Sequence, residues 1–255
     1  LGAFSSGILL YGISLLYGAT GNTRLPEIAA AISGRNLDDP LLLFATILLT
    51  VGFGFKLAVV PFHMWTPDVY QGAPTSVTAF MAVASKAASF GAFLRVFMEG
   101  LGGLKANWSA MFLLLCLATL ILGNVLALVQ TNVKRMLAYS SIAHAGYALI
   151  GVVATGHMEN SSGIASVLLY LTLYAFMTFG AFAIVAMLRK GGIEGVDIED
   201  FTGLAKRHPV AALLALHVRS VEVHGARCLA PRRRIQQPPG RGPAAGRGYV
   251  LRQHR

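Results

Sequence analysis

Three ionisable side chains, Lys56, Lys86 and His144, lie inside long apolar stretches of this sequence. A charged side chain at the centre of a membrane helix costs about 2.5–3.5 kcal/mol on insertion scales, so such residues usually mark an ion pathway. Burial disfavours the ammonium form of a lysine, which lets a buried lysine gain and release a proton. The pattern therefore predicts a proton relay formed by Lys56, Lys86 and His144.

Each of these residues also has a simpler explanation. A lysine near a helix end can extend its charge to the membrane interface, and this applies to Lys56 because Pro61 and Pro67 follow it. Lys86 lies near the middle of its apolar segment, too far from either end for the same explanation. For His144 taken alone, a hydrogen-bonded core histidine is the more frequent case.

A break in a membrane helix is predicted near residues 60–68, because Pro61 and Pro67 remove backbone donors there. Transporters place broken helices at their ion sites, so His63, seven residues after Lys56, is a candidate channel-lining residue. Asp68 follows Pro67 directly, and we interpret it as a helix cap rather than an acid or base.

A polar stripe accompanies His144. Ser140, His144 and Tyr147 are spaced by four and three residues, which places them on one face of a helix. Such a stripe is typical of a hydrogen-bonded water path, although helix packing alone would also explain it. Ser140 and Tyr147 are therefore further candidates for the channel lining.

The elements that must position these residues are membrane helices. The sequence is 55% hydrophobic and 13% charged, with a mean hydropathy of +0.62, whereas soluble domains carry about 25% charged residues. Six segments approach the roughly 20 residues that span a hydrocarbon layer, and none alternates in polarity as a barrel strand does. We expect an all-α, polytopic transmembrane bundle with segments near 1–18, 41–66, 74–98, 108–129, 136–155 and 163–188.

The two ends of the sequence suggest a fragment. Leu1 lies inside an apolar segment without an initiator methionine or a signal peptide, so we expect the true start to lie upstream. A seventh apolar segment begins at residue 208 and fails after Leu216. The predicted domains are a transmembrane domain at 1–216, incomplete at both ends, and a separate tail at 217–255.

The tail departs from the rest of the chain in composition. It holds nine arginines and one acid, which is +8 of the net charge of +10, and 22 of its 39 residues are Arg, Pro, Gly or Ala. We expect it to be disordered and out of frame, because the change falls inside an apolar run. A genuine basic tail that binds anionic lipid through residues 232–234 is the alternative. The rest of the chain carries the remaining net charge of +2. This small excess gives no reason to expect a nucleic-acid partner.

Cofactor chemistry is not expected in this chain. Cys116 and Cys228 are the only cysteines, which leaves no metal-ligand spacing and no disulfide framework. No nucleophile or phosphate-binding loop is recognisable either.

Four stretches carry a family resemblance. Residues 56–75 read Lys-Leu-Ala-Val-Val-Pro-Phe-His-Met-Trp-Thr-Pro-Asp-Val-Tyr-Gln-Gly-Ala-Pro-Thr, and residues 84–88, 123–147 and 180–182 extend the match. The chain resembles the antiporter-like membrane subunits of NADH-quinone oxidoreductase, respiratory complex I. The Tyr-Gln-Gly-Ala-Pro and Ser-Lys-Ala forms favour subunit N over subunits L and M. Mrp-type cation/proton antiporter subunits are homologous to these proteins.

The resemblance implies part of an inverted-repeat antiporter-like fold. Lys56 matches the lysine of the first broken helix, Lys86 the central-axis lysine, and His144 a polar position on the water-filled axis. The family's glutamate partner of Lys56 would precede Leu1, and the lysine of its second broken helix is missing from 217–255. The chain alone is therefore not expected to pump protons.

The resemblance also implies a place in the respiratory chain. It indicates a multi-pass translocase subunit of the bacterial inner (plasma) membrane, in contact with the lipid bilayer and with other membrane subunits of complex I. NADH, FMN, iron–sulfur clusters and quinone are expected in the whole complex, with no redox site in this chain. The alternatives are an Mrp-type antiporter subunit and a non-functional, truncated and frameshifted remnant.

Overall fold

The computed structural model describes residues 1–34, 39–157, 162–188, 196–201, 204–207 and 209. Its described residues include six helices that are long and apolar enough to cross a membrane, which confirms the predicted all-α bundle. These spans are Gly2–Thr20, Pro40–Leu57, Thr75–Gly100, Gly102–Leu128, Val133–Thr155 and Gly163–Met187. The predicted tail at 217–255, and all but Pro209 of the predicted seventh segment, lie outside the described residues.

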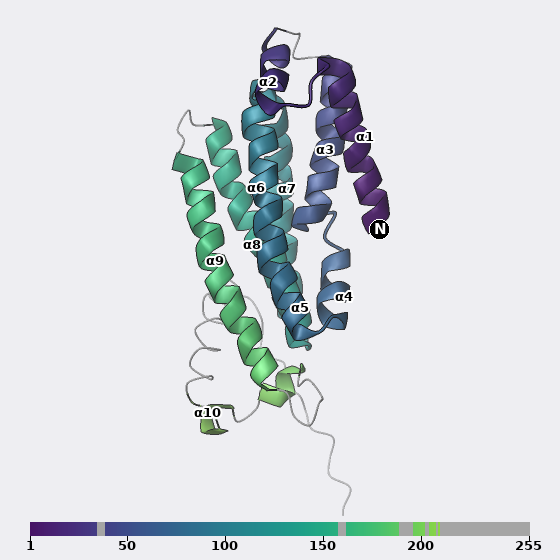
Figure 1. The fold of residues 1–255 in the computed structure, drawn as a ribbon. Helices are drawn as coiled ribbons and strands as arrows, with labels where there is room; N and C mark the ends of the chain where they lie inside the picture. Colours follow the sequence, from purple (N-terminus) through teal and green to yellow (C-terminus); the bar gives the residue numbers. More distant parts are fainter. Residues whose placement is uncertain (35–38, 158–161, 189–195, 202–203, 208, 210–255) are drawn as a thin grey trace, which may run out of the picture.

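The long helices run side by side (Figure 1). The helices that are single α-helices throughout are α1 (Gly2–Thr20), α3 (Pro40–Leu57), α7 (Lys105–Leu128), α8 (Val133–His157) and α9 (Ser162–Met187). Helix α1 packs on α3, and α8 packs between α7 and α9. The short helix α2 (Leu25–Ser33) lies at one end of the bundle and α4 (Trp65–Gly72) at the other. Two short elements, η4 (Ile198–Phe201) and α10 (Leu204–Arg207), follow α9.

The span Thr75–Gly100 is a composite helix. It consists of α5 (Thr75–Phe80), a π-helical turn η1 (Met81–Ser85), α6 (Lys86–Leu94) and a second π-helical turn η2 (Arg95–Gly100). A 3₁₀ turn, η3 (Gly102–Leu104), then leads into α7. A π turn takes in an extra residue and is found often at functional sites. Here the first π turn ends immediately before Lys86.

An aromatic cluster holds α3, α6 and α7 together, and Phe53 of α3 joins it with its ring 5.8 Å from that of Phe93. Phe93 contacts Phe97 and Phe112 with ring centroids 4.9 and 5.0 Å apart, and Phe97 contacts Trp108 at 6.1 Å. All four side chains are almost completely buried. Edge and tilted ring contacts of this kind add about 0.5–1.5 kcal/mol per pair to the burial of apolar area.

Helices α7 and α8 are in close contact at Gly123. A Cβ atom at this position would lie 2.9 Å from the backbone nitrogen of Ala143 and 3.0 Å from its Cα, so only glycine fits. Small residues permit such backbone contact between membrane helices. The contact places α8 in the middle of the bundle, where it is the most buried of the six spans.

The predicted helix break is confirmed, but it lies at residues 58–64 rather than 60–68. Helix α3 ends at Leu57, Ala58 adopts a left-handed conformation with φ 59°, and α4 begins at Trp65. Pro61 lies inside the break. Pro67 does not, since it occupies the first turn of α4, where a helix leaves its backbone N–H groups unbonded and proline is tolerated.

Backbone groups freed by the break find partners in the neighbouring helices. The N–H of Val60 donates to Oγ1 of Thr119 on α7 at 3.0 Å, and the indole Nε1 of Trp65 donates to the carbonyl of Phe55 at 2.9 Å. Irregular backbone at membrane depth is tolerated only where protein or a wet cavity satisfies it. Protein side chains serve that purpose here.

Candidate functional site

Lys86 is a buried lysine inside a membrane span, as the sequence predicts. Its side chain is 5% exposed, and its ammonium donates to the carbonyl oxygen and to Oγ of Ser141 on α8 at 2.5 and 2.6 Å. The ammonium also lies 5.8 Å from the ring centroid of Tyr174 on α9, within the range of a cation–π contact. Among the described residues, no ion pair joins Lys86 to a carboxylate.

The hydroxyl of Ser141 connects Lys86 to two further helices. Tyr174 donates to Ser141 Oγ at 2.9 Å, and the hydroxyl of Tyr70 on α4 lies 3.5 Å from the same atom. All of these side chains are buried. Lys86 is therefore held where α4, α6, α8 and α9 meet.

His144 lies on α8, three residues after Ser141 and thus about one helical turn away. Its Nδ1 forms a hydrogen bond with the hydroxyl of Tyr170, and its ring lies 5.0 Å from the ring of Tyr174 and 5.8 Å from that of Tyr147. Its exposed fraction is 9%. The structure thus brings His144 into the same polar cluster as Lys86, with Tyr174 of α9 in contact with both.

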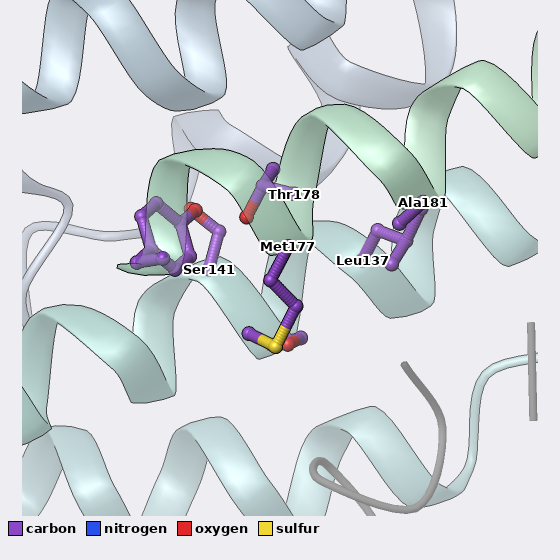
Figure 2. Close-up of a pocket in the computed structure, with 7 residues that line it drawn as sticks. Leu137, Ser141, Met177, Thr178 and Ala181 are labelled. Carbon is purple, nitrogen blue, oxygen red and sulfur yellow. The ribbon is translucent and has the colours of Figure 1, made fainter. Parts of the chain in front are cut away.

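The polar stripe on α8 is divided between a cavity and the bundle surface. Ser140 and Ser141 line a small cavity of about 10 Å³ between α8 and α9, close to the lower limit for one water molecule. Figure 2 shows Ser141 and Thr178 near one end of this cavity and Leu137 and Ala181 at the other, with Met177 between them. Tyr147 lies outside it, is 42% exposed, and accepts a bond from Asn124 at 3.4 Å.

Lys56 does not join this cluster. It lies in the last turn of α3, and its side chain is exposed on the described bundle. Its side chain is exposed here because α3 ends one residue later and no described helix covers that position. A cation in the last turn of a helix does interact favourably with the helix dipole.

His63 lies in the break between α3 and α4 and is partly buried. Its Nδ1 atom is buried and makes no hydrogen bond to the described residues. The seven-residue spacing from Lys56 does not place the two side chains on one helical face, because no helix continues through residues 58–64.

Asp68 is not a helix cap, in contrast to the sequence-based interpretation. Met64 is the N-cap of α4, and the carboxylate of Asp68 forms an ion pair with Nη1 of Arg135 on α8 at 2.7 Å. Arg135 also donates to Gln71 at 3.0 Å, and the ammonium of Lys134 donates to the carbonyl of Ala73 at 2.9 Å. The start of α8 therefore holds α4 by side-chain contacts.

Sequence reasoning missed the hydroxyl residues that surround Lys86 and His144: Tyr70, Ser141, Tyr170 and Tyr174. One signal was available on the last apolar segment, where Tyr170, Tyr174 and Thr178 recur every four residues and so share a helical face. For Ser141 no signal distinguished it from Ser140. Among the described residues, no group of three or more His, Cys, Asp or Glu side chains gathers as a metal site would require.

Comparison with known proteins shows a family match along most of the chain. The model of the NADH:quinone oxidoreductase/Mrp antiporter transmembrane family matches residues 1–222. The chain is 54% identical over 216 residues to NADH-quinone oxidoreductase subunit N 2 of Rhizobium meliloti strain 1021, a match that covers 85% of this chain and 44% of the relative. The chain thus spans less than half the length of that relative.

Solved structures share the fold. A chain of respiratory complex I from Thermus thermophilus with bound aureothin is 36% identical, with a TM-score of 0.63 over 90% of this chain and 51% of that one. A chain of the Mrp complex from Dietzia sp. DQ12-45-1b is 24% identical, with a TM-score of 0.75 over 87% and 40%. The second likeness concerns the fold alone. Taken with the helix break and the buried lysine, these matches show that the chain belongs to the NADH:quinone oxidoreductase/Mrp antiporter transmembrane family.

Proposed function

We propose that this chain is part of a subunit N of NADH-quinone oxidoreductase and that it conveys protons across the membrane. The observation that carries the proposal is the buried ammonium of Lys86, bonded to Ser141 at 2.5 and 2.6 Å inside a membrane span. The names of the relatives support the choice of complex, since proteins 46–54% identical to this chain are called subunit N.

The proposed role of Lys86 is to hold a proton at its Nζ atom. A lysine without a carboxylate partner balances a large desolvation cost against its hydrogen bonds, so its charge responds to a change in the neighbouring charges. His144 lies about one turn of α8 from Ser141, and its Nδ1 bonds to Tyr170. The hydroxyls of Ser141 and Tyr174 lie beside Lys86, and the hydroxyl of Tyr170 bonds to His144. Protons would be conveyed along this side of α8.

Electron transfer would take place in other subunits. We infer that NADH, FMN, iron–sulfur clusters and quinone are bound elsewhere in the complex, and that this chain has no redox site. It would assemble with other membrane subunits, in contact with lipid, as a multi-pass protein of the bacterial inner membrane. Lys56 belongs to the proposed relay through the family resemblance, and His63, Ser140 and Tyr147 remain candidates for the channel lining.

Lys86→Ala in the full-length protein, assembled in its complex, tests this function. NADH-driven proton uptake is measured in inverted membrane vesicles, relative to the NADH oxidation rate. We expect proton uptake per NADH to fall, because Ala cannot carry a proton. Thr50→Val is the matched control, since Thr50 is buried on α3 and, among the described residues, its hydroxyl bonds only to the carbonyl of Thr46 in its own helix. Normal proton uptake in Lys86→Ala at normal assembly levels would rule out the proposal.

A second candidate is a subunit of an Mrp-type cation/proton antiporter. The observation that favours it is the matching family model, which covers Mrp antiporter proteins as well as NADH:quinone oxidoreductase proteins. Sodium/proton exchange that is independent of NADH and lost in Lys86→Ala vesicles would support this candidate. NADH-dependent proton uptake lost in the same variant supports the first.

A further inference from the structure

One serine hydroxyl is shared by groups from three other helices. Ser141 Oγ lies 2.6 Å from the ammonium of Lys86, 2.9 Å from the hydroxyl of Tyr174 and 3.5 Å from the hydroxyl of Tyr70. Ser141 and Tyr70 are each 2% exposed. Their hydrogen bonds must therefore be made inside the protein.

The donors compete for this oxygen. A hydroxyl has one proton and two lone pairs, and the Lys86 ammonium and the Tyr174 hydroxyl both donate to Ser141. With both lone pairs taken, Ser141 cannot accept from Tyr70 and can meet the Tyr70 hydroxyl only by donating its own proton. The Tyr70 contact is accordingly the longest of the three, beyond the usual range for two hydroxyls. Within the described residues, Ser141 is the hydrogen-bond partner recorded for the Tyr70 hydroxyl.

We propose that Ser141 is a positioning residue that couples Lys86 to the second half of the broken helix, because Lys86 and Tyr70 share its hydroxyl. This inference rests on the proposed function, in which Lys86 gains and releases a proton. Bonds from a charged donor are about twice as strong as neutral ones, so loss of the proton weakens the hold of Lys86 on Ser141. The freed lone pair then accepts the Tyr70 hydroxyl, and the Tyr70 contact shortens.

Because α4 is anchored to α8, a change in the Tyr70–Ser141 contact would move the break between α3 and α4. Helix α4 has eight residues, so Tyr70 lies close to both of its ends. Asp68 is paired with Arg135 and the carbonyl of Ala73 with Lys134, both on α8. The other end of α4 is joined to α3 through residues 58–64 and through one side-chain hydrogen bond, from Trp65 to the carbonyl of Phe55. When Tyr70 moves against α8, the strain falls on the break, which contains His63.

The test compares Ser141→Ala, Tyr70→Phe and the double variant in the full-length protein assembled in its complex. Removing a bond to a charged group should lower NADH-driven proton uptake about tenfold in Ser141→Ala, and removing a neutral bond about fivefold in Tyr70→Phe. If both act through one shared bond, the double variant should fall about tenfold, whereas independent effects would multiply to about 50-fold.

Two further variants separate positioning from folding. Ser141→Thr keeps the hydroxyl, and the cavity beside Ser141 leaves space for a methyl group, so proton uptake should recover. Ser109→Ala is the matched control, since Ser109 is buried on α7 and bonds within its own helix. All amounts are normalised to the assembled complex.

The outcomes distinguish this inference from the proposed function. Multiplicative losses, or a Ser141→Ala variant that behaves like Ser109→Ala, would overturn the coupling while leaving the role of Lys86 intact. Failure of Ser141→Thr to recover proton uptake would also overturn it. Retained uptake in Lys86→Ala would instead overturn the proposed function, and the coupling with it.

Discussion

Replacing Thr119 by valine should loosen the helix break without changing the size of the side chain. Thr119 is fully buried on α7, and its Oγ1 accepts the N–H of Val60, which is itself 6% exposed. Valine fills the same volume but cannot accept a hydrogen bond, so the Val60 N–H loses its partner. A buried donor left unbonded costs about 1–3 kcal/mol.

Amide hydrogen exchange measures this cost locally. A loss of about 1–3 kcal/mol corresponds to exchange about 5- to 150-fold faster at Val60 and its neighbours in the break. Thr50→Val is the matched control, because within the described part of the chain the Thr50 hydroxyl bonds only to the carbonyl of Thr46, which also belongs to α3. Global stability in detergent should fall by a similar amount in Thr119→Val and by much less in Thr50→Val.

The result that would refute this reasoning is equal exchange at Val60 in Thr119→Val and Thr50→Val. It would mean that the backbone of the break is satisfied by groups other than Thr119. Thr119→Ser sharpens the comparison, since serine keeps the acceptor while removing one methyl group. Exchange at Val60 should remain slow in that variant.

Two further predictions concern how α8 is held. Arg135→Ala, Asp68→Ala and the double variant should give a coupling energy of about 0.2–1 kcal/mol that weakens with salt, because the pair is partly exposed; a salt-independent coupling would contradict a screened ion pair. Gly123→Ala should destabilise the bundle by about 1–3 kcal/mol, because its Cβ would meet the Ala143 backbone at 2.9 Å. Gly18→Ala on α1 has open space and is the control, and equal thermal unfolding of the two would contradict the close contact.

The bundle could be predicted from the sequence because every helix that crosses a bilayer must meet the same simple requirement. A spanning segment needs about 20 apolar residues in a helix that bonds its own backbone, and six such segments are visible without any knowledge of packing. The same requirement identified Lys86, since an ionisable group in an apolar segment is costly whichever helices surround it. Pro61 likewise predicted a break in the helix near its position.

The predictions from sequence were wrong where the outcome depended on the exact helix start or on contacts between distant residues. Pro61 and Pro67 were both expected to lie in the helix break. Pro67 instead fits the first turn of α4, because the start of a helix needs no backbone N–H donor. Asp68 followed a proline and suggested a cap, but Arg135, 67 residues away in the chain, is its partner. Long-range pairs of this kind depend on tertiary packing.

The sequence by itself determined which residues enter the membrane and which of them are costly there, because both follow from composition along a single helix. Only the tertiary structure decided which costly groups meet. The π turn at Met81–Ser85 comes directly before Lys86, and Gly123 allows α8 to lie against α7 at Ala143. In the packed bundle Ser141 of α8 lies against Lys86, whereas Lys56 stays on the described surface. No local pattern carries that information, because each contact joins residues from different helices.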